Sequence, residues 1–135
     1  MMLGHLPPTV AVAPLVTWML ILTVKHVVGD FIFQTSWMAN GKDARNGWLL
    51  PLLAHCAVHG VLATVIFAIL VPHLWFLGLV DFVVHTAIDR AKGFCVSHFD
   101  VRRNNDQWFW WLIGIDQAVH HFWDFGLALY VVAVP

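Results

Sequence analysis

The segment that decides the fold is Trp48–Val71, with the sequence WLLPLLAHCAVHGVLATVIFAILV. It carries no Asp, Glu, Lys or Arg, and the charge-free stretch around it runs from Asn46 to Val80. A helix of about 20 apolar residues crosses the ~30 Å hydrocarbon core of a bilayer. Because backbone groups in lipid must bond within their own segment, such a stretch is helical. The segment therefore predicts a transmembrane helix that must accommodate two imidazoles, those of His55 and His59.

The composition of the whole chain also indicates a membrane protein. Hydrophobic residues make up 60% of the 135 residues and charged residues 11%, against about 45–50% and about 25% in soluble domains. A soluble domain of this length could not bury so much apolar surface. The net charge of −1 and the lack of a basic stripe exclude a nucleic-acid-binding surface. We expect no cleaved signal peptide, because Pro14 follows the AVA triplet and no positive charge precedes it.

Four apolar segments define the predicted architecture, at about residues 11–38, 48–71, 74–94 and 108–134. Each is long enough to cross a bilayer as a helix. The connections are short, apart from the one at 95–107, and short connections join antiparallel neighbours. The chain is therefore predicted to form one all-α domain over residues 1–135, a polytopic membrane protein with a four-helix up-down transmembrane bundle.

Lysines and arginines are distributed unevenly between the two ends of this predicted bundle. The first and third connections carry Lys42, Arg45, Arg90, Lys92, Arg102 and Arg103. The opposite end carries none. Since cytoplasmic connections of membrane proteins are enriched in Lys and Arg, both basic connections are predicted to be cytoplasmic, with both termini outside.

Polar residues inside the predicted helices recur every three or four residues, so that each set shares one helix face. The sets are Thr23, His26, Asp30 and Gln34; His55 and His59; Asp81, His85 and Asp89; and Asp116, His120 and Asp124. At ~1.5 Å per residue, the histidines lie about 10–20 Å from the cytoplasmic ends of their helices. One Asp in lipid costs about 2.5–3.5 kcal/mol, so these groups are expected to form one interior layer. Lys25 falls on another side of its helix, and we expect it to pair with a carboxylate such as Asp124.

Three stretches of the chain carry a resemblance to a known family. HVVGDFIFQTSWMANGK (His26–Lys42), HCAVH (His55–His59) and HTAIDRAK (His85–Lys92) resemble the bacterial inner-membrane family catalogued as domain of unknown function 3307. The resemblance covers about Lys25–Lys92, and the Asp116–His120 spacing extends it into the last helix. It implies the helix count, the His/Asp set and the bacterial inner membrane, but it brings no assigned activity. A looser similarity is to small bacterial membrane proteins described as metal-dependent hydrolases.

The residue types in the layer predict a metal centre. Imidazole and carboxylate suit a divalent transition metal such as zinc, manganese or iron, and facing helices that each supply a pair can hold two ions. The predicted ligands are His26, Asp30, His55, His59, His85, His120 and Asp81. A metal ion there would activate water, with Asp89 or Asp116 as the general base. The predicted substrate-binding residues at the cytoplasmic edge are Gln34, Lys42, Lys92 and Arg90. The leading hypothesis is a membrane-embedded metal-dependent hydrolase acting on an anionic lipid or a lipid-linked phosphate.

Three other interpretations of the same pattern stay open. A transport subunit could conduct protons or a metal ion through the His/Asp layer, although the outer halves of the first two helices are apolar. Two axial histidines from facing helices could hold a b-type haem. A structural membrane subunit would use the polar groups only to hold helices together, and a homo-oligomer is compatible with each interpretation.

Overall fold

The computed structural model describes Pro7, residues 9–101 and residues 107–134, and all regular secondary structure within them is helical. The elements are α1 (Val12–Val27), a π-helical turn η1 (Val28–Ile32), α2 (Ser36–Gly41), α3 (Leu49–Leu70), a 3-10 turn η2 (Pro72–Leu74), α4 (Leu77–His98) and α5 (Gln107–Ala133). The all-α prediction is confirmed. Arg102 and Arg103, which entered the orientation argument, lie outside the described residues.

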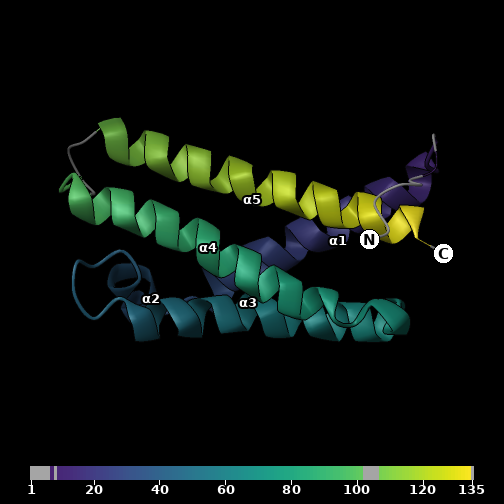
Figure 1. Ribbon diagram of the computed structural model, residues 1–135, viewed down its shortest axis with the longest axis horizontal. Helices are drawn as coiled ribbons and strands as arrows, with labels where there is room; N and C mark the ends of the chain where they lie inside the picture. The colour runs from purple at the N-terminus through teal and green to yellow at the C-terminus, as the bar shows by residue number, and fades with distance from the viewer. Residues whose placement is uncertain (1–6, 8, 102–106, 135) are drawn as a thin grey trace.

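Four long helices make up most of the described chain and run in alternating directions (Figure 1). Helix α3 packs against α4, α4 against α5, α5 against α1, and α1 against α3, so the four helices enclose a common interior. The start of α1 and the end of α5 lie together at one end of the molecule (Figure 1). The short helix α2 and the loop that follows it lie at the other end, beside the start of α3.

The predicted boundaries hold best for the second and fourth helices. Helices α3 and α5 begin and end within one residue of the predicted 48–71 and 108–134. Helix α3 stops before Pro72, because the residue ahead of a proline is driven out of the helical region, and Val71 has φ −142° and ψ 71°. The third helix is displaced from the predicted 74–94, because the turn η2 delays its start and it continues to His98.

The prediction of one continuous helix over residues 11–38 is wrong. Helix α1 ends at Val27, the π-helical turn follows, and the chain leaves the helix before α2 begins at Ser36. Two side chains stabilise this break: the Gln34 amide donates to the Asp30 carbonyl at 3.0 Å, and the Thr35 hydroxyl accepts from the Met38 amide at 3.3 Å. Thr35 has extended φ and ψ of −79° and 161°, as expected for a residue that caps the start of a helix.

Small residues allow α3 and α4 to approach closely. A Cβ atom added at Gly78 would lie 2.5 Å from the backbone nitrogen of Thr64, and one added at Gly60 would lie 2.8 Å from the Cβ of Phe82. Helices pack at this distance only where one partner lacks a side chain, a device that is common between membrane helices. The α3–α4 pair is therefore held in one register along its length.

An apolar core closes the end of the bundle that holds the two chain termini. Its buried members are Leu22, Ala63, Phe67, Leu74, Leu77, Leu127, Ala128 and Val131. Trp18 stacks on Phe67 with ring centroids 5.6 Å apart and seals the α1 side of this cluster. The interior of the other half is polar, so the molecule has an apolar end and a polar end.

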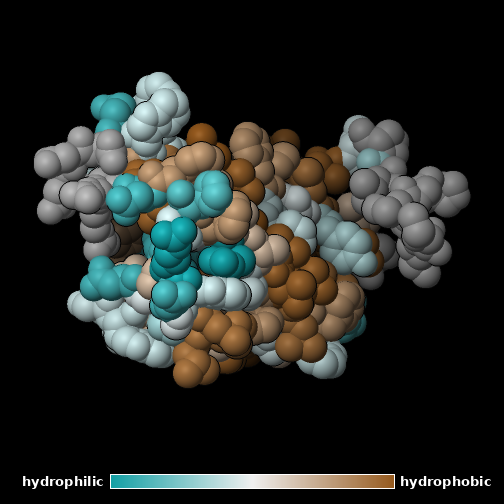
Figure 2. All heavy atoms as spheres, turned by 60° about the vertical axis from the view of Figure 1, so that its left-hand side comes forward, coloured by the Kyte–Doolittle hydropathy of each residue, from teal (hydrophilic) through white to brown (hydrophobic). Residues whose placement is uncertain are grey.

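The outside of the bundle is strongly apolar. Ile69 on α3 and Phe122 on α5 are 71% and 74% exposed, and similar side chains cover all four long helices. Figure 2 shows apolar side chains over the flanks and hydrophilic ones gathered near the end that carries the α2–α3 loop. Two helical segments in the described residues, Val12–Ile32 and Leu49–Leu70, are long and apolar enough to cross a membrane, with mean hydropathy 1.6 and 2.1.

Candidate metal centre

Five buried histidines from all four long helices meet in the polar half of the bundle. They are His26 from α1, His55 and His59 from α3, His85 from α4 and His120 from α5. The ring centroids of His59 and His85 lie 3.9 Å apart, those of His85 and His120 4.2 Å apart, and those of His26 and His120 5.0 Å apart. The structure therefore brings together every histidine that the sequence placed in the layer.

Two sets of side chains within this layer have the geometry to hold a metal ion. The first, which we call the Asp30 group, consists of Asp30, His55, His59 and His85. The second, which we call the Asp89 group, consists of His85, Asp89 and His120. Within each group, one ligand atom from every residue lies within 4.8 Å of all the others. These buried His/Asp groups could hold a metal ion, and His85 is common to both.

Asp30 is surrounded by imidazole and amide groups. Its Oδ1 lies 3.0 Å from His59 Nε2 and 3.4 Å from His55 Nε2. Its Oδ2 lies 3.1 Å from His26 Nε2 and accepts from the Gln117 side-chain amide, also at 3.1 Å. The carboxylate is thus oriented by four side chains from three helices and remains 12% exposed.

Asp89 is surrounded by cations as well as by imidazoles. The Lys42 ammonium donates to its Oδ2 at 3.0 Å, and His55 Nε2 lies 3.1 Å from the same oxygen. Its Oδ1 lies 3.9 Å from Lys92 Nζ and 3.9 Å from His120 Nε2. The residue predicted as a general base therefore lies within a potential ligand set and is fully buried.

Several buried ring nitrogens in the layer have no hydrogen-bond partner in the described structure, which supports a fit to a metal ion. They are Nδ1 of His26, His55 and His59, and Nε2 of His85 and His120. Nε2 of His26 and Nε2 of His55 each lie 3.1 Å from a carboxylate oxygen, of Asp30 and Asp89 respectively. Buried polar atoms are normally satisfied. His120 is informative, because its Nδ1 lies 2.8 Å from the Asp116 carbonyl and must donate to it. This bond leaves the lone pair on Nε2, the arrangement that metal-ligating histidines adopt.

A packing detail fixes one of these rings. A Cβ atom added at Gly29, in the π-helical turn, would lie 2.4 Å from the Cε1 atom of His59. The backbone of the turn therefore lies directly against the His59 ring, where any larger residue would displace it. The π-helical turn thus positions Gly29 and Asp30 across from α3.

A cavity of about 500 Å³ opens onto the layer from the polar end of the bundle. It is lined by the predicted substrate-binding residues Gln34, Lys42 and Lys92, together with Asp30 and Asp116. Lys92 Nζ lies between three carboxylates, 3.6 Å from Asp43, 3.9 Å from Asp89 and 3.7 Å from Asp116. The cavity therefore joins one potential metal ligand to two ammonium groups.

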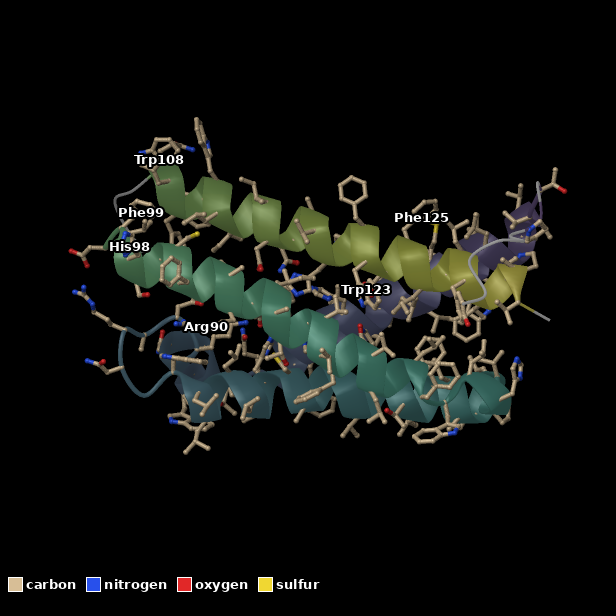
Figure 3. All side chains as sticks on the ribbon, viewed as in Figure 1. Arg90, His98, Phe99, Trp108, Trp123 and Phe125 are labelled. Carbon is tan, nitrogen blue, oxygen red and sulfur yellow. The ribbon has the colours of Figure 1, made fainter. Side chains whose placement is uncertain are left out.

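Two of the predicted site residues lie elsewhere. The Arg90 guanidinium sits 3.7 Å above the ring of Trp48, outside the residues that line this cavity, and Figure 3 places Arg90 toward the end of α4.

The other residue, Asp81, belongs to a separate buried cluster, which we call the Lys25 cluster: Lys25, Asp81, Asp124 and Trp123. Lys25 Nζ lies 2.8 Å from Asp81 and 3.8 Å from Asp124. The predicted pairing of Lys25 with a carboxylate is therefore confirmed, but the closer partner is Asp81 and not Asp124.

Sequence reasoning missed two residues that the structure places in contact with these groups. Gln117 follows Asp116 directly and orients Asp30 across the interior. Trp123 donates from its ring nitrogen to Asp81 Oδ1 at 2.8 Å, and Figure 3 shows it between α5 and α4. Both carry a signal that was available, since each is a polar or amphipathic side chain next to a residue already placed in the interior.

Comparison with known proteins gives a family but no characterised relative. No curated protein and no solved structure matched the chain. The sequence model of the family described as "Protein of unknown function (DUF3307)" matches residues 17–131, which include α3, α4 and most of α1 and α5. The chain therefore belongs to the DUF3307 family.

Proposed function

We propose that this protein is a membrane-embedded metal-dependent hydrolase that acts on an anionic lipid or a lipid-linked phosphate. The observation that carries the proposal is the continuity between the Asp30 group and the cavity, because Asp30 belongs to both. An anionic group held by the cavity lysines would lie beside a metal ion held by Asp30. The similarity to membrane-bound hydrolases points the same way but stays a prediction.

Membrane embedding is supported by the inverted distribution of polar groups. Five histidines are buried, as are Lys42, Asp89 and Asp116 and the three charged residues of the Lys25 cluster, whereas large apolar side chains face outward. A protein in water would expose the first set and bury the second. Helices α4 and α5 have lower hydropathy because their charged residues face inward, so their outer faces are still suited to lipid.

The orientation in the membrane is argued from charge. Lys42, Arg45 and the end of α4 lie with the α2–α3 loop at the polar end of the bundle. Basic connections are retained on the cytoplasmic side. We therefore place the cavity in the cytoplasmic half of a bacterial inner membrane, with both termini on the outer side.

The donor set of the Asp30 group suits zinc, manganese or iron(II). Three imidazoles and one carboxylate are intermediate in softness and match the ligands of these ions. When bound, such an ion supplies Lewis-acid activation of water and of a substrate oxygen. His55, His59 and His85 would hold it from α3 and α4, while Gln117 keeps the Asp30 carboxylate turned toward them.

Asp116 is better placed than Asp89 to be the general base. Both oxygens of Asp89 are occupied by Lys42, His55 and Lys92. Asp116 lines the cavity, and its buried Oδ1 has no hydrogen-bond partner in the described structure. That oxygen can accept a proton from attacking water, and Lys92 at 3.7 Å stabilises the ionised carboxylate before the transfer.

Conduction across the membrane is disfavoured by the apolar core. The polar interior ends at the Lys25 cluster, and beyond it the bundle is filled by buried apolar side chains such as Leu22, Phe67 and Leu127. A proton or ion pathway needs polar groups across the full thickness. The structure therefore suits chemistry that is approached from one side.

The test is metal content together with hydrolysis. The purified protein in detergent should carry a transition metal measurable by mass spectrometry, and it should release inorganic phosphate from phosphatidic acid in mixed micelles. His59→Ala should weaken the affinity for the metal ion at least ~100-fold, because it removes one of four ligands. His73→Ala, on the turn η2 at the apolar end, is the matched control. Protein that binds no transition metal at all would contradict the proposal.

A further inference from the structure

We infer that the centre holds a single divalent ion, in the Asp30 group, and that the Lys42 ammonium stands where a second metal ion would otherwise bind, beside Asp89. The inference rests on the proposed function and adds the number of ions and the role of Lys42. Lys42 then provides the fixed positive charge that binds the anionic part of the substrate, which in dinuclear enzymes is the task of the second ion.

The two carboxylates differ in their neighbours, and this difference is the first argument. The contacts of Asp30 in the described structure are the imidazoles of His26, His55 and His59 and the Gln117 amide. Asp89 has an ammonium group on each oxygen, Lys42 at 3.0 Å and Lys92 at 3.9 Å. A metal ion must lie about 2.0–2.2 Å from a carboxylate oxygen. At Asp89 it would meet a buried like charge, whereas Asp30 offers no such repulsion.

The shared histidine is the second argument. Both groups contain His85, and one ring nitrogen binds one ion. Once His85 is committed to the Asp30 group, the Asp89 group retains only Asp89 and His120. Two protein ligands are fewer than the three that catalytic zinc sites use. The Asp89 group would therefore hold a second ion only weakly, and the charge of the Lys42 ammonium is enough to exclude it.

The charge of the region is the third argument. Four carboxylates face the cavity and its inner wall, those of Asp30, Asp43, Asp89 and Asp116, against the ammonium groups of Lys42 and Lys92. With neutral imidazoles the balance is −2, and one divalent ion neutralises it. A second ion would leave two uncompensated positive charges among buried groups, which is costly.

Lys42 is held in place by the fold. Its backbone carbonyl lies against Gly93 of α4, where an added Cβ atom would be only 2.9 Å away. Its side chain is buried yet lines the cavity. An anion that enters the cavity therefore meets an ammonium group whose position is fixed by packing.

The test is the number of metal ions bound, measured by mass spectrometry on detergent-purified protein after saturation with Zn²⁺ or Mn²⁺ and removal of free ion. Wild-type protein should bind one equivalent. Lys42→Met should bind two, because the change removes the competing charge, and Lys42→Arg should stay at one. The double variant Lys42→Met with Asp89→Asn should return to one, because it lacks the second carboxylate.

The outcomes separate this inference from the proposed function. Wild-type protein without metal would overturn both. Two equivalents in wild-type protein, or one equivalent in a folded Lys42→Met variant, would overturn the inference and leave the hydrolase proposal intact. Asp89→Asn provides a check that does not depend on Lys42 variants: it should keep its single ion, and loss of that ion would show that Asp89 is a ligand of the resident metal.

Discussion

The His/Asp layer and the Lys25 cluster are both buried and charged, but they differ in how many of their polar atoms have hydrogen-bond partners. In the Lys25 cluster, Asp81 accepts from the Lys25 ammonium on one oxygen and from the Trp123 ring nitrogen on the other. Only Asp124 Oδ2 in that cluster is left without a hydrogen-bond partner. In the layer, ring nitrogens of five histidines lack partners in the described structure. The Lys25 cluster thus satisfies most of its own polar atoms, whereas the layer retains buried nitrogens that could bind a metal ion.

The largest effect should come from breaking the Lys25 cluster. Asp81→Ala leaves a buried ammonium and a buried ring N–H without their closest acceptor, so the free energy of unfolding should fall by about 3–5 kcal/mol. Denaturant unfolding in detergent measures it. Asp81→Asn, which keeps an acceptor for Trp123, should lose less. If Asp81→Ala instead kept its stability and lost its metal, Asp81 would be a ligand, as the sequence pattern predicts.

The next effect should come from the contact between the π-helical turn and His59. Gly29→Ala places a methyl group on the His59 ring, and such overpacking typically costs about 1–3 kcal/mol. Metal affinity should fall with it, because the ring is a ligand of the Asp30 group; isothermal titration with Zn²⁺ measures the change. Gly114→Ala is the matched control, since an added Cβ atom there meets nothing within 4 Å. Equal metal affinities in the two variants would remove His59 from the ligand set.

The smallest effect should come from the residue that orients Asp30. Gln117→Met keeps the length of the side chain but cannot donate to Asp30 Oδ2, and loss of such a supporting bond lowers metal affinity about 10–100-fold. The Gln34 amide donates to the backbone carbonyl of Asp30 and not to its carboxylate, so Gln34→Met should leave metal affinity within about twofold of wild type. Competition with a chelator dye compares the two variants. A Gln117→Met variant with wild-type affinity would show that Asp30 needs no such support.

Helical spacing and depth are sufficient to predict the layer. His26, His55, His59, His85 and His120 lie on single faces of their helices and at similar depth, and the structure brings their rings together. The helix face and the depth of a residue follow from the rotation of ~100° and the rise of ~1.5 Å per residue, once the segments are helical. The same reasoning placed Gln34, Lys42 and Lys92 at the edge, where they line the cavity.

What could not be predicted depends on which helices are neighbours. Lys25 lies one step round α1 from His26 and was assigned to another side, yet it is buried because α4 and α5 both reach that side with Asp81 and Asp124. A helical wheel of one segment contains no information on how much of its circumference is enclosed by other helices.

The break in the helix after the π-helical turn also could not be predicted from the sequence. Residues 28–35 contain no proline, and Gly29 alone does not distinguish a π-helical turn from a continuous helix. The interruption is decided by side-chain bonds of Gln34 and Thr35 to the backbone and by the packing of Gly29 on His59. Of these contacts, only the packing of Gly29 on His59 requires α3 to be in place.

The apolar core that closes one end of the bundle also bears on the order in which ligands would exchange under the proposed function. The cavity reaches the layer beside Gln34, Lys92 and Asp116, whereas Phe67 and its neighbours fill the opposite end. An anion held by the cavity lysines would therefore stand between a metal ion in the Asp30 group and the entrance. A product that stayed in the cavity would then delay both the next substrate and the departure of the ion behind it.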